Sequence, residues 1–255
     1  MKITERNPQG DAPLVMLTGY MFGAWTFAPM LEALDSMRII VIEDVGTPDR
    51  DHGGGSYRGA IDRIERNLAA RGLGPVHLAG HSMGGFVAQE YAALCPERIK
   101  SLTLLGSCHL DEFKGSHRVN ALPALDALFD LDEDAFFRFS VNNIFSPDFL
   151  GAPDQAAQLR RDFDQCPPDR ERCRAQLHML EDLYASGGRY DPPGVPCLAV
   201  YGEKDSIVPA DWVRRLDRYL QPEPRYRPIP SSHMFMYERP TETAAVLRDW
   251  VQQFR

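Results

Sequence analysis

Short apolar runs alternate with amphipathic stretches in the first and last parts of the chain. Mostly apolar runs lie at residues 14–17, 38–42, 76–80, 99–105 and 196–201, and a shorter, more polar strand-like stretch lies at 225–229. An unbroken apolar run of this length is typical of a strand buried on both faces of a parallel sheet. Between the runs, apolar residues recur at helical spacing, as at Ile61, Ile64 and Leu68. This alternation predicts an α/β fold with a doubly wound, mostly parallel sheet of about six strands.

The middle of the chain interrupts the alternation. Residues 107–190 carry apolar residues at helical spacing, and prolines separate the helical pieces. We therefore expect an α/β core formed by residues 1–106 and 191–255, with a helical insertion at 107–190 that caps the sheet. The phenylalanines of the insertion include Phe136, Phe137, Phe139, Phe145 and Phe149. We expect most of them to pack inside the cap and roughly a third to face an apolar pocket.

Composition and charge narrow the classes of function. The chain of 255 residues has a formal net charge of -8, which argues against nucleic acid or an anionic membrane as a partner. No apolar run approaches the roughly 20 residues that span a bilayer. Because the start also lacks the apolar core of a signal peptide, we expect a cytoplasmic protein. The five cysteines form no C-x-x-C pair, so neither a disulfide framework nor a zinc site is expected.

One motif with chemical meaning joins an apolar run to a helical stretch. Gly80-His81-Ser82-Met83-Gly84-Gly85 has the pattern G-x-S-x-G, between a strand-like run and a helix-like stretch at 86–94. In that context the pattern predicts a nucleophile elbow, a tight turn that lifts a serine hydroxyl clear of the sheet. Small residues flank such a serine because Cβ atoms would collide across the turn. Ser82 is therefore the candidate nucleophile.

Two further polar residues follow later strands. Asp205 comes after the run at 196–201, and His233 comes after the run at 225–229. Catalytic residues of parallel sheets gather at the carboxyl ends of strands. A serine needs an imidazole to take its proton, and the imidazole needs a carboxylate to hold its tautomer. Ser82, Asp205 and His233 therefore form a candidate triad, with Glu203 and Asp211 as rival carboxylates and a simple turn role as the alternative for Asp205.

These motifs resemble those of the α/β-hydrolase superfamily over almost the whole chain. They are Gly80 to Gly85, Gly202-Glu203-Lys204-Asp205-Ser206-Ile207-Val208-Pro209 and Ser232-His233. Within the superfamily the chain is similar to the compact, helically capped serine carboxylesterases, of which the pimeloyl-ACP methyl ester carboxylesterases are one group. The resemblance implies hydrolysis of a small or medium acyl ester or thioester through an acyl-Ser82 intermediate, without a cofactor or a metal.

The resemblance also implies an oxyanion hole and exposes two departures from the family pattern. One donor would be the backbone N–H of Met83, and the other that of Tyr20, with Met21 as a rival. The loop that carries the second donor usually begins His-Gly, but here it begins Thr18-Gly19, so we expect Thr18 to replace only part of the histidine's support. The N-terminal segment is short for the hairpin that often precedes the first core strand, so we expect the sheet to be trimmed there.

Other functions fit the same residues. Lactone hydrolysis, cofactor-free haloperoxidase or perhydrolase chemistry, and a hydroxynitrile-lyase-like reaction could all use the same triad. A non-catalytic binding protein is a further alternative, although it would have no need for all three residues in this order. An arginine-rich stretch from Arg160 to Arg174 is interrupted by acidic residues, so we interpret it as a solvated helix face. The alternative is a docking site for an acyl-carrier protein or a carboxylate substrate.

Overall fold

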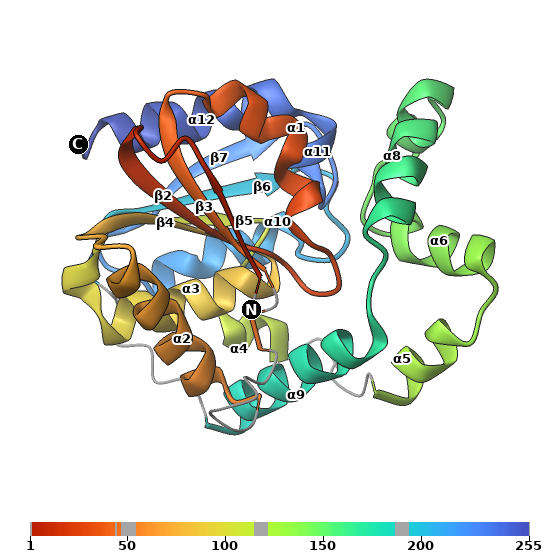
Figure 1. The fold of residues 1–255 in the computed structure, drawn as a ribbon, viewed down its shortest axis with the longest axis horizontal. Coiled ribbons are helices and arrows are strands. Elements are labelled where there is room, and N and C mark those ends of the chain that lie inside the picture. Colours follow the sequence, from red (N-terminus) through yellow and green to blue (C-terminus); the bar gives the residue numbers. More distant parts are fainter. Residues whose placement is uncertain (1, 44, 47–54, 115–121, 187–193, 255) are drawn as a thin grey trace.

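A single sheet of seven strands lies at the centre of the protein (Figure 1). The structure is a computed structural model and describes residues 2–43, 45–46, 55–114, 122–186 and 194–254. The strands lie side by side in the order β1-β3-β2-β4-β5-β6-β7, and every neighbouring pair except β1 with β3 is parallel. They are β1 (Ile3–Arg6), β2 (Asp11–Leu17), β3 (Met37–Ile42), β4 (Val76–His81), β5 (Ile99–Leu105), β6 (Cys197–Gly202) and β7 (Arg225–Ile229). The predicted doubly wound, mostly parallel sheet is confirmed.

The N-terminal edge of the sheet carries one short strand that the sequence did not predict, and this strand pairs with β3 and not in a hairpin with β2. The residues of β1 pair antiparallel with β3, from Ile3 opposite Ile42 to Arg6 opposite Ile39. A tight turn follows, in which Asn7 has a positive φ of 54° and its carbonyl accepts the N–H of Gly10 at 2.8 Å. Four residues suffice because the backbone ladder to β3 supplies the hydrogen bonds of an edge strand. This strand raises the expected six strands to seven.

Helices cover both faces of the sheet because each strand turns alternate apolar side chains to opposite sides. Val15 and Leu17 pack in one hydrophobic cluster with α2 (Tyr57–Ala70) and α3 (Met83–Leu94). Leu14 and Met16 pack in another with α1 (Ala28–Leu31) and α12 (Pro240–Gln252). All four of these β2 residues are fully buried. Figure 1 shows α1 and α12 on one side of the sheet and α2 and α3 on the other.

The remaining core helices are short and border the sheet. They are η1 (Ala24–Phe27), η2 (Glu32–Leu34), η3 (Pro96–Arg98), α10 (Ala210–Arg214), η4 (Arg215–Arg218) and α11 (Phe235–Glu238). Together η1, α1 and η2 form one continuous helical stretch. Pro29 lies in the first turn of α1, where a backbone N–H would have no partner within the helix.

All the helices of the predicted insertion fall between β5 and β6. They are α4 (Leu110–Lys114), α5 (Leu122–Phe129), α6 (Glu133–Asn142), α7 (Pro147–Leu150), α8 (Pro153–Gln165) and α9 (Arg170–Ser186). In Figure 1, α5, α6 and α8 form an arc beside the core, while α9 runs back toward α2. A helical insertion is therefore present, and its expected end at residue 190 lies outside the described residues.

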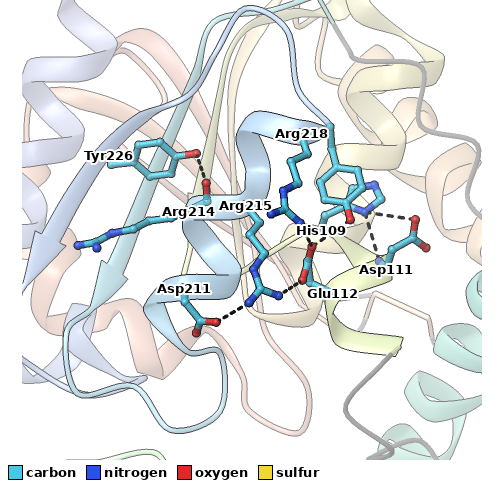
Figure 2. Close-up of polar contacts among 9 residues, drawn as sticks. His109, Asp111, Glu112, Asp211, Arg214, Arg215, Arg218 and Tyr226 are labelled. Atoms are coloured by element: carbon cyan, nitrogen blue, oxygen red, sulfur yellow. Dashed lines mark hydrogen bonds and ion pairs between the residues drawn. The ribbon is translucent and has the colours of Figure 1, made fainter.

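The first helix of the insertion is fastened to the core. Glu112 on α4 accepts hydrogen bonds from Arg215 at 2.6 Å and from the Tyr219 hydroxyl at 3.0 Å. His109 stacks on the Tyr219 ring with a centroid distance of 3.6 Å. Figure 2 shows that Arg215 binds both Glu112 of α4 and Asp211 of α10. The insertion therefore starts from a fixed point beside β6.

The helices do not resemble membrane-spanning segments. In the part of the chain that the structure describes, no helix combines the length and the apolar character needed to cross a bilayer.

Candidate active site

The turn between β4 and α3 has the geometry of a nucleophile elbow. Ser82 lies between them with φ 51° and ψ -119°, a backbone conformation that costs energy for any residue with a side chain. Close packing maintains it. A Cβ on Gly80 would lie 2.3 Å from the Gly84 carbonyl oxygen, and a Cβ on Gly84 would lie 2.6 Å from that of Leu17. Glycine is therefore required on both sides of Ser82.

His233 and Asp205 form a buried pair at the same edge of the sheet. Nδ1 of His233 lies 2.7 Å from Oδ2 of Asp205. The other Asp205 oxygen accepts the backbone N–H groups of Ile207 at 2.8 Å and Val208 at 2.9 Å. Asp205 therefore makes the contacts of a turn residue and also contacts His233. Only 7% of Asp205 and 4% of His233 is exposed, so water screens their interaction weakly.

The rival carboxylates have other surroundings. Asp211 pairs with Arg215 at 2.8 Å on the surface, and Glu203 is exposed. The structure thus brings His233 together with Asp205 and places Asp211 in an ion pair of its own.

His81, within the elbow itself, was not singled out from the sequence. Its ring centroid lies 4.8 Å from that of His233, and its Nε2 lies 3.4 Å from the His233 carbonyl oxygen. Burial, together with the neighbouring His233, holds the pKa of His81 well below its ordinary value. His81 is therefore an uncharged partner packed against the His233 ring.

The loop after β2 approaches the elbow closely. A Cβ on Gly19 would lie 3.3 Å from Cβ of Ser82. The two rivals for the second oxyanion donor differ in their partners. The N–H of Met21 donates to Oε1 of Gln176 at 3.0 Å, whereas the N–H of Tyr20 has no acceptor among the described residues. The N–H of Met83 lies in the first turn of α3, where helix geometry provides no acceptor.

Ser82, His81 and His233 line a cavity of about 330 Å³. The insertion supplies much of its apolar wall, through Leu128, Phe139, Ile144, Leu177 and Leu180. Of the five phenylalanines considered from the sequence, only Phe139 lines the cavity among the residues that the structure describes. The others pack within the insertion or against the core, as Phe145 does against Phe149 at 5.4 Å. Most therefore form packing contacts, as expected.

A carboxylate far along the chain links the insertion to the loop that carries His233. Glu238 accepts hydrogen bonds from the Ser146 N–H and hydroxyl, both at 2.7 Å. It also lies 2.8 Å from the Ser231 hydroxyl and 2.6 Å from that of Ser232. Sequence reasoning missed Glu238, because no local pattern indicates contacts across such separations.

The arginine-rich stretch is engaged largely with acidic side chains of the insertion. Arg160 pairs with Asp134 at 2.6 Å, and Arg170 with Asp130 at 2.5 Å. Arg174 pairs with Asp126 at 2.5 Å. These pairs favour the interpretation as a solvated helix face. Across the described ranges, no three His, Cys, Asp or Glu side chains come together as a metal site.

Curated relatives include several kinds of hydrolase. The chain is 33% identical to a protein named carbamate hydrolase RutD of Azorhizobium caulinodans, over 78% of this chain and 75% of that one. It is 28% identical to a pimeloyl-[acyl-carrier protein] methyl ester esterase of Aeromonas hydrophila, over 84% of each chain. It is also 30% identical to the acetyltransferase component of the acetoin cleaving system of Pseudomonas putida, over 83% of this chain but only 56% of that longer protein.

Solved structures share the fold at low identity. A protein named non-heme bromoperoxidase BpoC from Mycobacterium tuberculosis superposes with a TM-score of 0.79 at 20% identity, covering 100% of this chain and 96% of that one. The enol-lactonase of Burkholderia xenovorans gives a TM-score of 0.76 at 18% identity, covering 98% and 96%.

A family model provides the remaining evidence. The model described as the Alpha/beta hydrolase family matches residues 14–246, which include the elbow, both later loops and the entire insertion. With the seven-stranded sheet and the helices between β5 and β6, this match shows that the chain belongs to the α/β hydrolase family.

Proposed function

We propose that this protein is a serine hydrolase that cleaves a small or medium acyl ester through a covalent acyl-Ser82 intermediate. The observation that carries the proposal is the 2.7 Å contact between His233 and Asp205, with His233 lining the same cavity as Ser82. A histidine held by a buried carboxylate next to an elbow serine is the arrangement that nucleophilic acyl transfer needs.

The chemistry follows from the roles that these groups can play. His233 takes the proton of the Ser82 hydroxyl through Nε2 as the serine oxygen attacks the ester carbonyl. Asp205 holds Nδ1–H and stabilises the imidazolium that forms. The N–H groups of Tyr20 and Met83 stabilise the tetrahedral oxyanion, and one such donor is worth about 2.7–4 kcal/mol.

The intermediate then divides the reaction into two halves. His233 passes its proton to the leaving alkoxide, so that the alcohol departs and the acyl group stays on Ser82. His233 then deprotonates a water molecule that attacks the acyl-enzyme, and it returns this proton to the Ser82 oxygen as the carboxylic acid is released.

The cavity indicates the kind of acyl group. Its wall is mostly apolar, and Glu181 is the one carboxylate among the described residues that line it. Such a wall suits an uncharged aliphatic or aromatic acyl chain and disfavours an anionic one. A thioester or a carrier-linked ester is compatible with the same chemistry. The paired arginines on the insertion do not favour docking of an acidic carrier protein.

Lactone hydrolysis is the second candidate. A lactone is a cyclic ester that opens through the same intermediate, and an enol-lactonase is among the structurally similar proteins. Haloperoxidase-like, perhydrolase and lyase reactions on the same residues remain alternatives, and so does a binding protein without activity.

The proposal is tested with p-nitrophenyl esters of increasing chain length and with a fluorophosphonate probe. We expect turnover of the esters, one equivalent of probe on Ser82, and loss of both in Ser82→Ala. Ser36→Ala, at an exposed serine far from the elbow in sequence, should match the wild type. Full ester turnover by Ser82→Ala would refute the proposal. Inactivity of the wild type on esters, thioesters and lactones, without labelling, would favour a binding protein.

A further inference from the structure

We propose that helix α9 of the insertion holds the oxyanion loop, residues 18–22, in its donor conformation, with Gln176 and Arg172 as positioning residues. The inference rests on the proposed function, because it concerns the donor that Tyr20 would supply. Gln176 and Arg172 would affect catalysis indirectly, because they bind the backbone of Met21, next to the proposed donor Tyr20.

Met21 is the residue on which α9 acts. Its φ of 75° is unusual for a residue with a side chain. Both of its backbone groups are bound by α9. Its N–H donates to Oε1 of Gln176 at 3.0 Å, and its carbonyl accepts from Nη2 of Arg172 at 3.2 Å. The two bonds restrain the peptides on either side of Met21 in a conformation that it would otherwise tend to leave.

Gln176 is buried and contacts the loop instead of facing solvent. Only 1% of the residue is exposed. A buried amide of this kind needs a partner, and its Oε1 is used by the N–H of Met21. Since this bond occupies the Met21 donor, it leaves Tyr20 as the N–H of the loop that can face an oxyanion.

Helix α9 can serve as a fixed support because it is itself packed on the core. Asp182 accepts the backbone N–H of Tyr57, at the start of α2, at 3.1 Å. Met179 and Leu183 of α9 are fully buried in the cluster that contains α2 and α3. A Cβ on Gly46 would lie 3.3 Å from Cα of Gln176. The backbone around Gln176 therefore lies directly against the loop after β3.

The contacts of α9 bear on the replacement of the usual loop histidine by Thr18. The Thr18 hydroxyl is buried and has no hydrogen-bond partner among the described residues. It therefore does not replace the contacts of a loop histidine. The side chains of α9, more than 150 residues further along the chain, restrain the loop instead.

The test uses two substitutions of similar length that remove one bond each. Gln176→Met removes the acceptor for the Met21 N–H, and Arg172→Met removes the donor to its carbonyl. Loss of a whole oxyanion donor costs about 10²–10³-fold in kcat. We expect Gln176→Met to lower kcat about 10–100-fold and Arg172→Met to lower it less, with KM changed by less than about threefold.

A transition-state analogue separates positioning from a general structural defect. A trifluoromethyl ketone forms a tetrahedral adduct with Ser82 and needs the oxyanion hole, whereas an uncleavable ether analogue of the substrate does not. We expect the Ki of the ketone to rise in parallel with the loss of kcat/KM, while the Ki of the ether stays near the wild-type value. Glu171→Gln, at an exposed position on the same helix, should change neither.

The possible outcomes are distinct. If wild-type protein is not labelled on Ser82 and turns over no ester, the proposed function fails. If the wild type is active but both variants keep its kcat and its ketone Ki, this inference alone is overturned. Circular dichroism reports folding. Should Gln176→Met fail to fold, Arg172→Met carries the test, and an equal rise in Ki for both inhibitors would also overturn the inference.

Discussion

At the scale of single residues, Asp205 combines two tasks. One carboxylate oxygen accepts two backbone N–H groups of its own turn, and the other lies 2.7 Å from His233. The two turn hydrogen bonds fix the orientation of the Asp205 carboxylate. Its other oxygen is therefore already in position to accept a hydrogen bond from His233. A residue that resembles an ordinary turn former can therefore also orient His233, the proposed base.

The first prediction concerns Asp205→Asn. Its carbonyl oxygen can still accept the turn N–H groups, but its amide cannot hold His233 in the required tautomer. We expect kcat on a p-nitrophenyl ester to fall by about 10³–10⁴-fold with little change in melting temperature. Asp211→Asn is the matched control and should retain activity. The reverse pattern, with Asp211 essential and Asp205 dispensable, would assign the carboxylate role to Asp211.

The second prediction concerns His81 and pH. Its pKa is lowered in the folded protein from an ordinary value of 6.5, chiefly by burial. Below pH 6.5 the unfolded chain therefore binds a proton that the folded protein does not, and stability falls as the pH is lowered. Each proton contributes a slope of about 1.4 kcal/mol per pH unit. Urea unfolding between pH 7.5 and 5.0 should show a shallower decline for His81→Gln than for the wild type.

The difference between the two stability curves reports His81 together with its coupling to the neighbouring His233. Parallel stability curves for wild type and His81→Gln would show that His81 is not held uncharged in the folded state.

At the scale of elements, the site depends on contacts between the insertion and the loops after β6 and β7. Residues 143–146, which join α6 to α7, bind both loops. The Asn143 carbonyl accepts from Ser206 at 3.2 Å, and the Ile144 carbonyl accepts from Met234 N–H at 3.1 Å. Glu238 adds bonds from Ser146 to the same assembly. The insertion therefore helps to hold the loop of His233.

The third prediction tests this link. Glu238→Ala removes the acceptor shared by Ser146, Ser231 and Ser232. Hydrogen bonds to a charged group contribute about 1.5–3 kcal/mol, so we expect a loss of about 2 kcal/mol in unfolding free energy. Hydrogen exchange should rise at residues 143–150 and 230–234, and kcat should fall. Glu242→Ala, at an exposed position on α12, is the control. Unchanged exchange in both segments would contradict the link.

Some of these elements could be predicted from the sequence and others could not. Most of the longer strands were predictable because each contains a mostly apolar run, and Ser82, Asp205 and His233 were candidates because each lies within a few residues of a strand end. The edge strand β1 was not predictable, since Ile3-Thr4-Glu5-Arg6 has no apolar run and its pairing with β3 is tertiary. The contacts of Gln176 and Glu238 could not be predicted from the sequence either. They bind partners 155 and 92 residues away, and such contacts leave no local pattern.

At the scale of the whole molecule, charge and cavity point to the same class of substrate. The chain carries a net charge of -8, and the described wall of the cavity adds Glu181 without a lysine or an arginine. An anionic acyl chain would enter against both the overall field and a nearby carboxylate. An uncharged chain meets a mostly apolar wall.

The fourth prediction compares two methyl esters of equal length, one ending in a methyl group and one in a carboxylate. We expect kcat/KM to favour the uncharged ester, and Glu181→Gln to improve the anionic ester about three- to tenfold relative to the other, since Glu181 is partly exposed and water screens it. Glu171→Gln, exposed on the same helix, should leave the ratio unchanged. A preference for the anionic ester in the wild type would refute this substrate class.

The central claim is that an acyl group is carried on Ser82. Rapid-quench intact-protein mass spectrometry with a short-chain p-nitrophenyl ester tests it most directly, followed by peptide mapping of the adduct. We expect a mass increase of one acyl group on the peptide that contains Ser82. The adduct should form during a burst of p-nitrophenol and be absent in Ser82→Ala. Steady ester turnover without an adduct, or an adduct on another residue with turnover retained in Ser82→Ala, would contradict it.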